Sequence, residues 1–265
     1  MSFIVVIGDA GAGKTSWIVA QLKYKIRTEG MRRQKQSTAM IEVFNRTRMK
    51  PLTPPDKFPF YTNFDTQFKI GYEKIYKPYF LDEEYFGLPN KGKLVVPVVP
   101  CSVIAFQEMD DAYNSRERGK MAESVSGMYN KRRHWLIDIY ADLHKLMIMD
   151  SVIRTVADKV VEIQRSVHEK NFAGKIIKTT WYCREFDDIK QAQLYVNSDG
   201  KEGVYRETVY VNEGDIFKCF DTHSCAREFL PKDGEDFIYL PQRSEIDDIS
   251  KLPPEKAKFY TKGAK

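Results

Sequence analysis

The stretch Phe3-Ile4-Val5-Val6-Ile7-Gly8-Asp9-Ala10-Gly11-Ala12-Gly13-Lys14-Thr15 decides the fold of this chain. Its first five residues are all apolar, which is typical of a parallel strand covered on both faces. Its last eight match the pattern G-x-x-x-x-G-K-[ST] without a mismatch. Apolar residues then recur at helical spacing, and Gly30 offers a helix stop. The sequence therefore predicts a buried strand, a phosphate-binding loop and a helix over about 14–27, with Lys23, Lys25 and Arg27 facing outward.

The glycines of this loop allow backbone N–H groups to point into one concave nest, and the helix N-terminus adds about half a positive charge. We expect Lys14 to reach the β and γ phosphates of a nucleoside triphosphate, and the Thr15 hydroxyl to ligate Mg²⁺. The alternative, a glycine turn that only joins strand to helix, is disfavoured by three glycines, a Lys and a Thr at these offsets. ATP and Mg²⁺ are the predicted cofactors. The predicted nucleotide-binding residues are Gly8, Asp9, Ala10, Gly11, Ala12, Gly13, Lys14, Thr15 and Ser16.

Apolar runs after the loop predict an α/β fold: a P-loop NTPase with a mostly parallel sheet flanked by helices. Further buried strands are expected at 60–64, 102–106, 135–141 and 160–163, and a short helix at 149–157. The predicted organisation has three parts. Residues 1–173 form the P-loop NTPase core, with an insertion at about 65–93. Residues 174–232 form a β-rich extension of the same domain, and 233–265 form an acidic, proline-containing tail that is a candidate for disorder.

The run Val103-Ile104-Ala105-Phe106-Gln107-Glu108 is the best candidate for the acidic element that such NTPases need at the end of a neighbouring strand. An Asp followed by a Glu is usual there. Gln107 offers an amide oxygen and no charge, which predicts weak magnesium affinity unless Glu108, Asp110 or Asp111 substitutes. Glu108 is the predicted water-orienting base. A solvated turn after a core strand is the alternative for this acidic group.

Charge is unevenly distributed along the 265 residues. The formal net charge is +5, but residues 23–50 alone carry +7, so the remainder sums to −2. A hydrophobic fraction of 42% is ordinary for a globular chain and excludes a disordered or collagen-like one.

The sequence contains four cysteines and no CxxC pair: Cys101, Cys183, Cys219 and Cys225. The last two are spaced for a disulfide, but reduced thiols are favoured because no secretory leader precedes the first strand. The longest apolar stretch, 94–106, has 13 residues and two prolines. A bilayer needs roughly 20 apolar residues, so no transmembrane segment is expected.

Motifs beyond the loop follow one another in the order found in a known family. A proline-bearing lead-in precedes the strand ending at Gln107-Glu108, and an aromatic and an arginine follow at Tyr113 and Arg116. Asp138-Ile139 opens the next strand. In this succession the chain resembles the N-terminal ATPase domain of zonular occludens toxin-like (Zot-like) phage proteins, related to filamentous-phage assembly and DNA-packaging ATPases. The resemblance covers most of residues 1–225, and its remaining motifs are Met149-Asp150, Ile153-Arg154 and Cys219-Phe220-Asp221-Thr222.

The resemblance implies an oligomeric ring in which an arginine reaches the neighbouring subunit's nucleotide. Arg116 and Arg154 are the candidates, and an intrachain salt bridge explains each equally well. The polar sensor position, usually Gln, falls near His144, although a surface histidine in a loop fits as well. The departures at Gln107 and His144 place hydrolysis in doubt more than binding. The predicted catalytic residues are Lys14, Glu108, Arg116 and Arg154, and the predicted metal ligands are Thr15, Gln107 and Glu108.

The basic stretch offers candidate contacts to nucleic-acid phosphates. Aromatic residues are sparse there, so base stacking is not indicated. A solvated helix face and loop is an equal alternative. The predicted DNA contacts are Arg32, Arg33 and Lys35. A second basic group would line the same pore in a ring: Arg116, Arg118, Lys120, Lys131, Arg132 and Arg133.

From the resemblance we expect a viral P-loop ATPase that couples ATP hydrolysis to movement of phage DNA in virion assembly or packaging, located in the host-cell cytoplasm. The expected partners are further copies of the chain, phage DNA, and other virion-assembly or membrane proteins. Filamentous-phage members of the family carry a membrane helix after the ATPase domain, and this chain shows none. The alternatives are a nucleotide-dependent binding or scaffold module with weak or no hydrolysis, and a small-molecule kinase, for whose lid the late β segment is a poor match.

Overall fold

A computed structural model of the chain describes residues 1–47, 53–64, 66–70, 74–76, 79–80, 98–109, 129–149 and 151–220. The strands are β1 (Phe3–Ile7), β2 (Phe60–Thr62), β3 (Phe68–Ile70), β4 (Lys74–Tyr76), β5 (Tyr79–Phe80), β6 (Val103–Phe106), β7 (Asp138–Asp142), β8 (Lys159–Lys170), β9 (Ile176–Phe186) and β10 (Arg206–Glu213). The helices are α1 (Lys14–Asn45), α5 (Ser151–Thr155), α6 (Ile189–Asn197) and the 3₁₀ turn η1 (Ile216–Cys219). The expected acidic tail, 233–265, lies outside the described residues.

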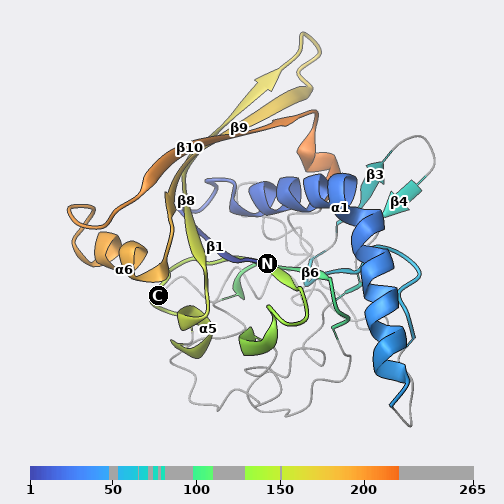
Figure 1. The fold of residues 1–265 in the computed structure, drawn as a ribbon. Coiled ribbons are helices and arrows are strands. Elements are labelled where there is room, and N and C mark those ends of the chain that lie inside the picture. The colour runs from blue at the N-terminus through green and yellow to red at the C-terminus, as the bar shows by residue number, and fades with distance from the viewer. Residues whose placement is uncertain are drawn as a thin grey trace, which may run out of the picture. The chain divides into compact units, whose positions relative to one another are not determined.

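An eight-stranded sheet organises the described part of the chain, in the order β10-β9-β8-β1-β7-β6-β2-β5 (Figure 1). The six strands from β8 to β5 in this order are parallel, while β9 and β10 pair antiparallel beyond β8. The predicted α/β fold with a mostly parallel sheet is therefore confirmed. Within the predicted insertion, β3 and β4 form a separate antiparallel pair.

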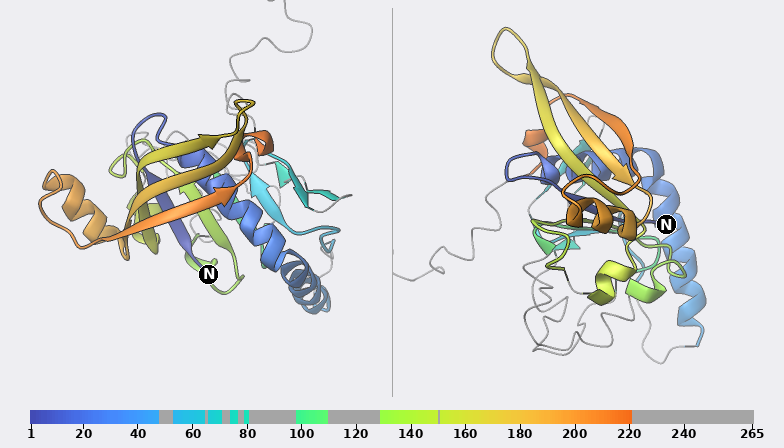
Figure 2. Two further views of the ribbon diagram at one scale, coloured as in Figure 1. Left: turned by 90° about the horizontal axis from the view of Figure 1, so that it is seen from above. Right: turned by 90° about the vertical axis from the view of Figure 1, so that its left-hand side faces the viewer.

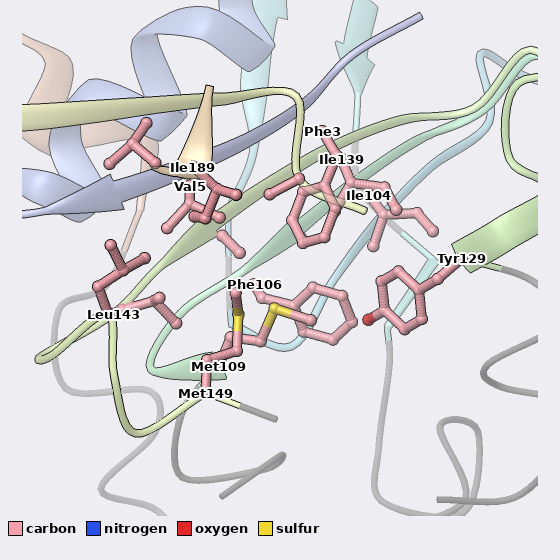
Figure 3. Packing of buried hydrophobic residues seen from close by; sticks show 14 of the residues in the cluster. Phe3, Val5, Ile104, Phe106, Met109, Tyr129, Ile139, Leu143, Met149 and Ile189 are labelled. Carbon is pink, nitrogen blue, oxygen red and sulfur yellow. The ribbon is translucent and has the colours of Figure 1, made fainter. Parts of the chain in front are cut away.

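The central strands are buried because their residues are apolar on both faces, as the sequence predicted for residues 3–7. Val5, Ile104 and Ile139 from three adjacent strands are each fully buried, and Phe3 stacks on Tyr129 with ring centroids 5.7 Å apart. Figure 3 shows this cluster, in which Met109 and Met149 close one side. Parallel strands put their carboxyl ends at one edge of the sheet, so β1, β6 and β7 end close together.

Helix α1 is much longer than predicted. It continues through Gly30 to Asn45, and the two halves of its ribbon run in different directions (Figure 1). The buried positions of the second half, Arg33, Ser37 and Ile41, recur at the helical period. Two of these three are polar types, so the spacing of apolar residues does not predict this half of the helix. Gly30 is buried in the contact with Phe58 and does not end the helix.

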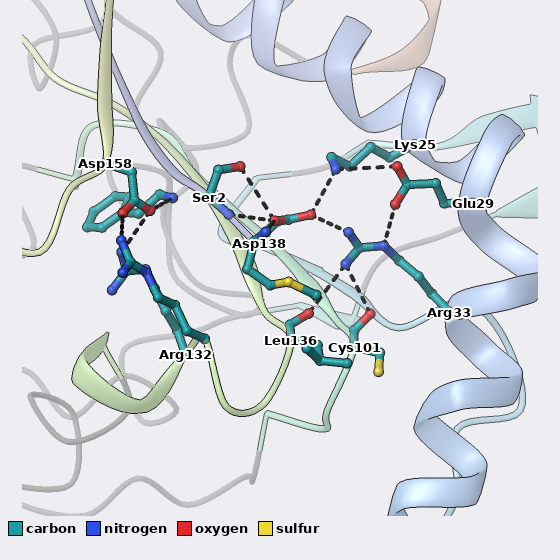
Figure 4. Close-up of polar contacts among 12 residues, drawn as sticks. Ser2, Lys25, Glu29, Arg33, Cys101, Arg132, Leu136, Asp138 and Asp158 are labelled. Carbon is teal, nitrogen blue, oxygen red and sulfur yellow. Dashed lines mark hydrogen bonds and ion pairs between the residues drawn. The ribbon is translucent and has the colours of Figure 1, made fainter. Parts of the chain in front are cut away.

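A buried ion network fastens α1 to the beginning of β7 (Figure 4). Arg33 donates to the Asp138 carboxylate and, through Nε, to Glu29 Oε2 at 2.6 Å. Lys25 Nζ lies 2.8 Å from Asp138 Oδ2, and the backbone N–H of Ser2 donates to Oδ1 at 2.8 Å. Burial raises the pKa of Asp138, but the charges of Arg33 and Lys25 outweigh it and hold that pKa below its usual value.

This network corrects two expectations. Lys25 turns inward to Asp138, so it is not on the outward face of the helix. Arg33 is 6% exposed and fully engaged by Asp138 and Glu29, so the prediction that it contacts DNA is wrong. Arg132, expected to line a pore, is likewise buried and pairs with Asp158 at 2.7 Å. Arg32 and Lys35 are exposed on α1.

The β-rich extension is continuous with the central sheet. The predicted boundary at 173/174 falls in the turn between β8 and β9, a long hairpin that projects beyond the other strands (Figures 1 and 2). Strand β10 covers the start of α1, where Tyr210 packs edge-on against Trp17 with ring centroids 5.2 Å apart. The extension therefore braces the helix that begins at the phosphate loop. No helix in the described ranges is long and apolar enough to cross a membrane.

Candidate nucleotide-binding site

The loop between β1 and α1 is shaped by glycines with positive φ angles. Gly8 has φ 147° and Gly13, the residue before α1, has φ 96°. A Cβ at Gly8 would lie 2.6 Å from the carbonyl oxygen of Ile163, so the loop packs directly on β8. Only glycine fits both the dihedral angle and the space. No side chain caps the N-terminus of α1, and its first turn holds no acidic residue. The helix thus presents its positive end to whatever the loop encloses.

A cavity of about 300 Å³ opens at this helix terminus. Its lining combines the loop, polar side chains at or just after the carboxyl ends of β6 and β7, and two aromatic rings: Ala10, Gly11, Gly13, Lys14, Thr15, Ser16, Glu108, Asp142, His144, Phe217 and Phe220. Lys14 Nζ donates to the carbonyl oxygens of Gly8, at 3.0 Å, and Asp9, at 3.3 Å. The ammonium is therefore held inside the curve of the loop, where a phosphate chain would lie.

The predicted loop residues meet around this cavity. Six of them line the cavity directly: Ala10, Gly11, Gly13, Lys14, Thr15 and Ser16. Gly8 and Asp9 supply the carbonyl oxygens that hold Lys14, and the N–H of Ala12 donates to Asp9 O at 3.1 Å, which closes the turn. Their roles in nucleotide binding remain predictions.

Asp142, which the sequence analysis missed, is a central acidic group of the cavity. Asp142 is the last residue of β7, the strand beside β1, and is only 1% exposed. Thr15 Oγ1 donates to its Oδ2 at 2.9 Å, and the backbone N–H of Glu108 donates to Oδ1. Burial raises the pKa of this carboxyl to about 6, although these two hydrogen bonds and the Lys14 charge act in the other direction.

The two residues of the acidic element predicted at the end of β6, Gln107 and Glu108, differ in their relation to the cavity. The Glu108 side chain lines the cavity, 41% exposed, and lies 3.8 Å from His144 Nε2. The backbone of Gln107 is held by the Asn63 amide, through N–H···Oδ1 at 2.8 Å and Nδ2–H···O at 2.9 Å. Gln107 is not among the described residues that line the cavity. Its role as a metal ligand stays a prediction, whereas Glu108 and His144 are both in place at the cavity.

A tryptophan of the β-rich extension holds the start of α1 in place from behind the loop. Trp181 of β9 is buried and its indole N–H donates to Ser16 Oγ at 3.3 Å, while Ser16 Oγ donates to Gly13 O at 2.8 Å. The start of α1 is therefore fixed by a residue more than 160 positions away in sequence. Nothing in the local motif signals this contact.

Arg154 is not among the described residues that line the cavity. Arg154 on α5 donates from Nη1 to the carbonyl oxygen of Met147 at 3.2 Å. Arg116 lies outside the described residues, as do Asp110 and Asp111. Cys219 carries a free thiol, while Cys225 also falls outside the described ranges.

The donors around the cavity suit a hard divalent cation. Thr15, Glu108 and Asp142 present a hydroxyl and two carboxylates, and oxygen ligands are those that Mg²⁺ prefers. In the described part of the chain, no group of three or more His, Cys, Asp or Glu side chains is arranged to hold a metal alone. Nucleotide-bound Mg²⁺ normally uses one or two carboxylates with the phosphates and water, so this donor set fits it.

Solved structures with similar folds come from two kinds of protein. The N-terminal domain of zonular occludens toxin from Neisseria meningitidis aligns with 16% identity and a TM-score of 0.47, over 83% of this chain and 98% of that one. The genome packaging NTPase B204 from Sulfolobus turreted icosahedral virus 2, in complex with ATP-gammaS, aligns with 11% identity and a TM-score of 0.36, over 81% and 98%. No protein-family model and no curated protein matches the chain.

These two neighbours are the kinds of protein that the sequence resemblance named, a Zot N-terminal domain and a viral packaging NTPase. Both TM-scores are below 0.5, and the likeness concerns the fold alone.

Proposed function

We propose that this chain is a viral P-loop ATPase of the Zot-like kind, which couples ATP binding and hydrolysis to DNA movement during virion assembly or packaging. The observation that carries the proposal is the cavity at the start of α1, where Lys14, Thr15 and Glu108 meet an uncapped helix N-terminus. Anionic phosphates are the ligand class that such a terminus and an ammonium attract. Viral origin, DNA as the moved polymer and the host-cell cytoplasm follow from the sequence resemblance.

The proposal includes a catalytic role for each of these residues. Lys14 neutralises the phosphates, and the Thr15 hydroxyl helps to hold Mg²⁺, which supplies Lewis-acid polarisation of the phosphoryl oxygens. Glu108 is partly exposed at the cavity wall, so it can reach a water molecule and accept its proton. His144 beside it can hydrogen-bond the same water or the terminal phosphate. Arg116 or Arg154 acts from a neighbouring subunit in a ring.

With Arg33 buried, the proposed DNA contacts are the two remaining basic residues on the exposed side of α1. Arg32 has a side chain that is 67% exposed, and Lys35 is exposed on the same helix. Contacts of this kind bind phosphates without reading bases, so affinity should fall steeply with salt. A double Arg32→Ala and Lys35→Ala variant is expected to bind duplex DNA more weakly with a shallower salt dependence. Unchanged binding, or binding independent of salt, would count against this surface.

Steady-state ATP turnover, measured with and without DNA, tests the proposed function. The wild-type chain is expected to release phosphate faster when DNA is present, and Glu108→Gln is expected to retain nucleotide binding while losing most of the turnover. Failure of the wild-type chain to hydrolyse ATP under either condition would contradict the motor.

A nucleotide-dependent scaffold is the second candidate, and the uncharged Gln107 in the place of the usual Asp favours it. Tight ATP binding without turnover, in the presence of DNA, is the outcome expected of that candidate.

A further inference from the structure

Asp142 belongs neither to the phosphate-loop pattern nor to the Gln107-Glu108 element, yet its carboxylate lines the cavity. It lies at the carboxyl end of β7, immediately beside the P-loop strand β1, with Val6 paired to Asp142 in the parallel register. The side chain reaches across to the first turn of α1, where Oδ2 accepts from Thr15 Oγ1 at 2.9 Å. Thr15 is the residue whose hydroxyl the phosphate-loop pattern assigns to Mg²⁺.

The orientation of this carboxylate is fixed from a second side. The backbone N–H of Glu108 donates to Oδ1, and Glu108 has φ 53°, in the left-handed region. That conformation is unfavourable for a residue that carries a side chain. The turn after β6 therefore adopts a strained form in which its N–H meets Asp142. Each carboxylate oxygen still has acceptor capacity beyond the one hydrogen bond it receives.

Burial of Asp142 is not offset by an ion pair within the described residues. No Lys or Arg of that part of the chain lies within salt-bridge distance of it, in contrast to Asp138 four residues earlier, which has Arg33 and Lys25. Buried charges are usually paired or coordinate metals, and Lys14, which lines the same cavity, acts on Asp142 only from beyond salt-bridge distance. The position facing the cavity and the Thr15 hydroxyl is where such a cation would be shared.

We propose that Asp142, together with Thr15, holds the divalent cation of the nucleotide, and that it takes the role the family pattern gives to position 107. The carboxylate has moved by one strand, from the end of β6 to the end of β7, which lies nearer to β1 in the sheet. The uncharged Gln107 then need not weaken cation binding. This inference rests on the proposed function, because it assumes that a nucleoside triphosphate occupies the cavity.

Manganese binding tests the inference without reference to turnover. The affinity of Mn²⁺ for the protein loaded with ATPγS is measured by electron paramagnetic resonance, and ATPγS affinity is measured separately in excess EDTA. Asp142→Asn is expected to weaken Mn²⁺ binding by at least roughly 10-fold, since loss of a residue that merely supports a metal ligand already costs about 10–100-fold. Its ATPγS affinity in EDTA should stay within about threefold of wild type. Gln107→Ala is the matched control, and its Mn²⁺ affinity should also stay within about threefold.

Two results would overturn the assignment: wild-type Mn²⁺ affinity in Asp142→Asn, or an equal loss in Gln107→Ala. Asp142→Ser, which is also neutral and can still accept a hydrogen bond, replaces Asp142→Asn if thermal unfolding shows that the latter does not fold. The same series separates the two proposals. A wild-type chain that binds no ATPγS in either buffer refutes the proposed function itself, whereas normal nucleotide binding with an unaffected Asp142 variant refutes only the role of Asp142.

Discussion

Replacing Arg33 by Met is predicted to destabilise the fold strongly although Arg33 lies outside the cavity. The Arg33 and Asp138 side chains are 7% and 1% exposed. Removing one partner of a buried ion pair costs about 3–5 kcal/mol, because the other charge loses its compensation. Asp138 keeps Lys25 and the Ser2 N–H, so the lower end, about 3 kcal/mol, is expected. For a domain of this size, that corresponds to a fall in Tm of roughly 6–12 °C.

Differential scanning calorimetry of Arg33→Met and Arg32→Met provides the test. Arg32 is the matched control, since it neighbours Arg33 on the same helix and its side chain is 67% exposed. Among the described residues Arg32 forms one ion pair, with Glu29 at 3.7 Å and at the surface, where such pairs contribute about 0–1 kcal/mol. Equal Tm values for the two variants would refute the reasoning, because a buried network should not respond like a surface charge.

Three further perturbations follow from the described contacts. Gly8→Ala is expected to cost about 2 kcal/mol or more in urea unfolding, since the new Cβ would meet Ile163 O at 2.6 Å; an unchanged midpoint would contradict this. Trp181→Phe removes the donor to Ser16 Oγ and should cost about 1 kcal/mol by the same measurement, so a stability equal to wild type would exclude that hydrogen bond. Because the pKa of Asp138 is lowered in the folded state, its stabilisation is present above the unfolded pKa and is lost as pH falls through the folded one. Urea unfolding between about pH 5 and 2 should therefore show a steeper loss in wild type than in Asp138→Asn, and parallel curves would show that the pKa is not lowered.

The sequence was sufficient for the parts of the fold that depend on local pattern. The apolar run 3–7 and the glycine loop appear where the pattern placed them, and the strand expected at 102–106 is observed at Val103–Phe106. Helix α1 was truncated in the prediction because its second half buries Arg33 and Ser37, residue types that normally signal solvent. Asp138, the main partner of Arg33, lies 105 positions away, so the burial of Arg33 could not be inferred from the helix alone.

Asp142 was missed for a different reason. The segment Ile139-Tyr140-Ala141-Asp142 has the same form, apolar residues followed by an acid, as the pattern sought at the end of β6. The family resemblance directed attention to Gln107 and Glu108 instead. Which of the two strands lies beside β1 is a property of the sheet order, and only the structure gives it. Trp181 is a similar case, since its contact with Ser16 joins segments 165 positions apart.

Isothermal titration of ATPγS with Mg²⁺ into the wild-type chain and Lys14→Ala tests the central claim, that residues 8–15 bind a nucleoside triphosphate. The wild-type chain is expected to bind one ATPγS. Loss of the Lys14 ammonium removes charge-assisted hydrogen bonds of about 1.5–3 kcal/mol, which corresponds to a roughly 10–100-fold weaker affinity. Lys35→Ala, on the exposed side of the same helix, should bind as wild type does. No binding by the wild-type chain, or unchanged affinity in Lys14→Ala, would contradict the claim.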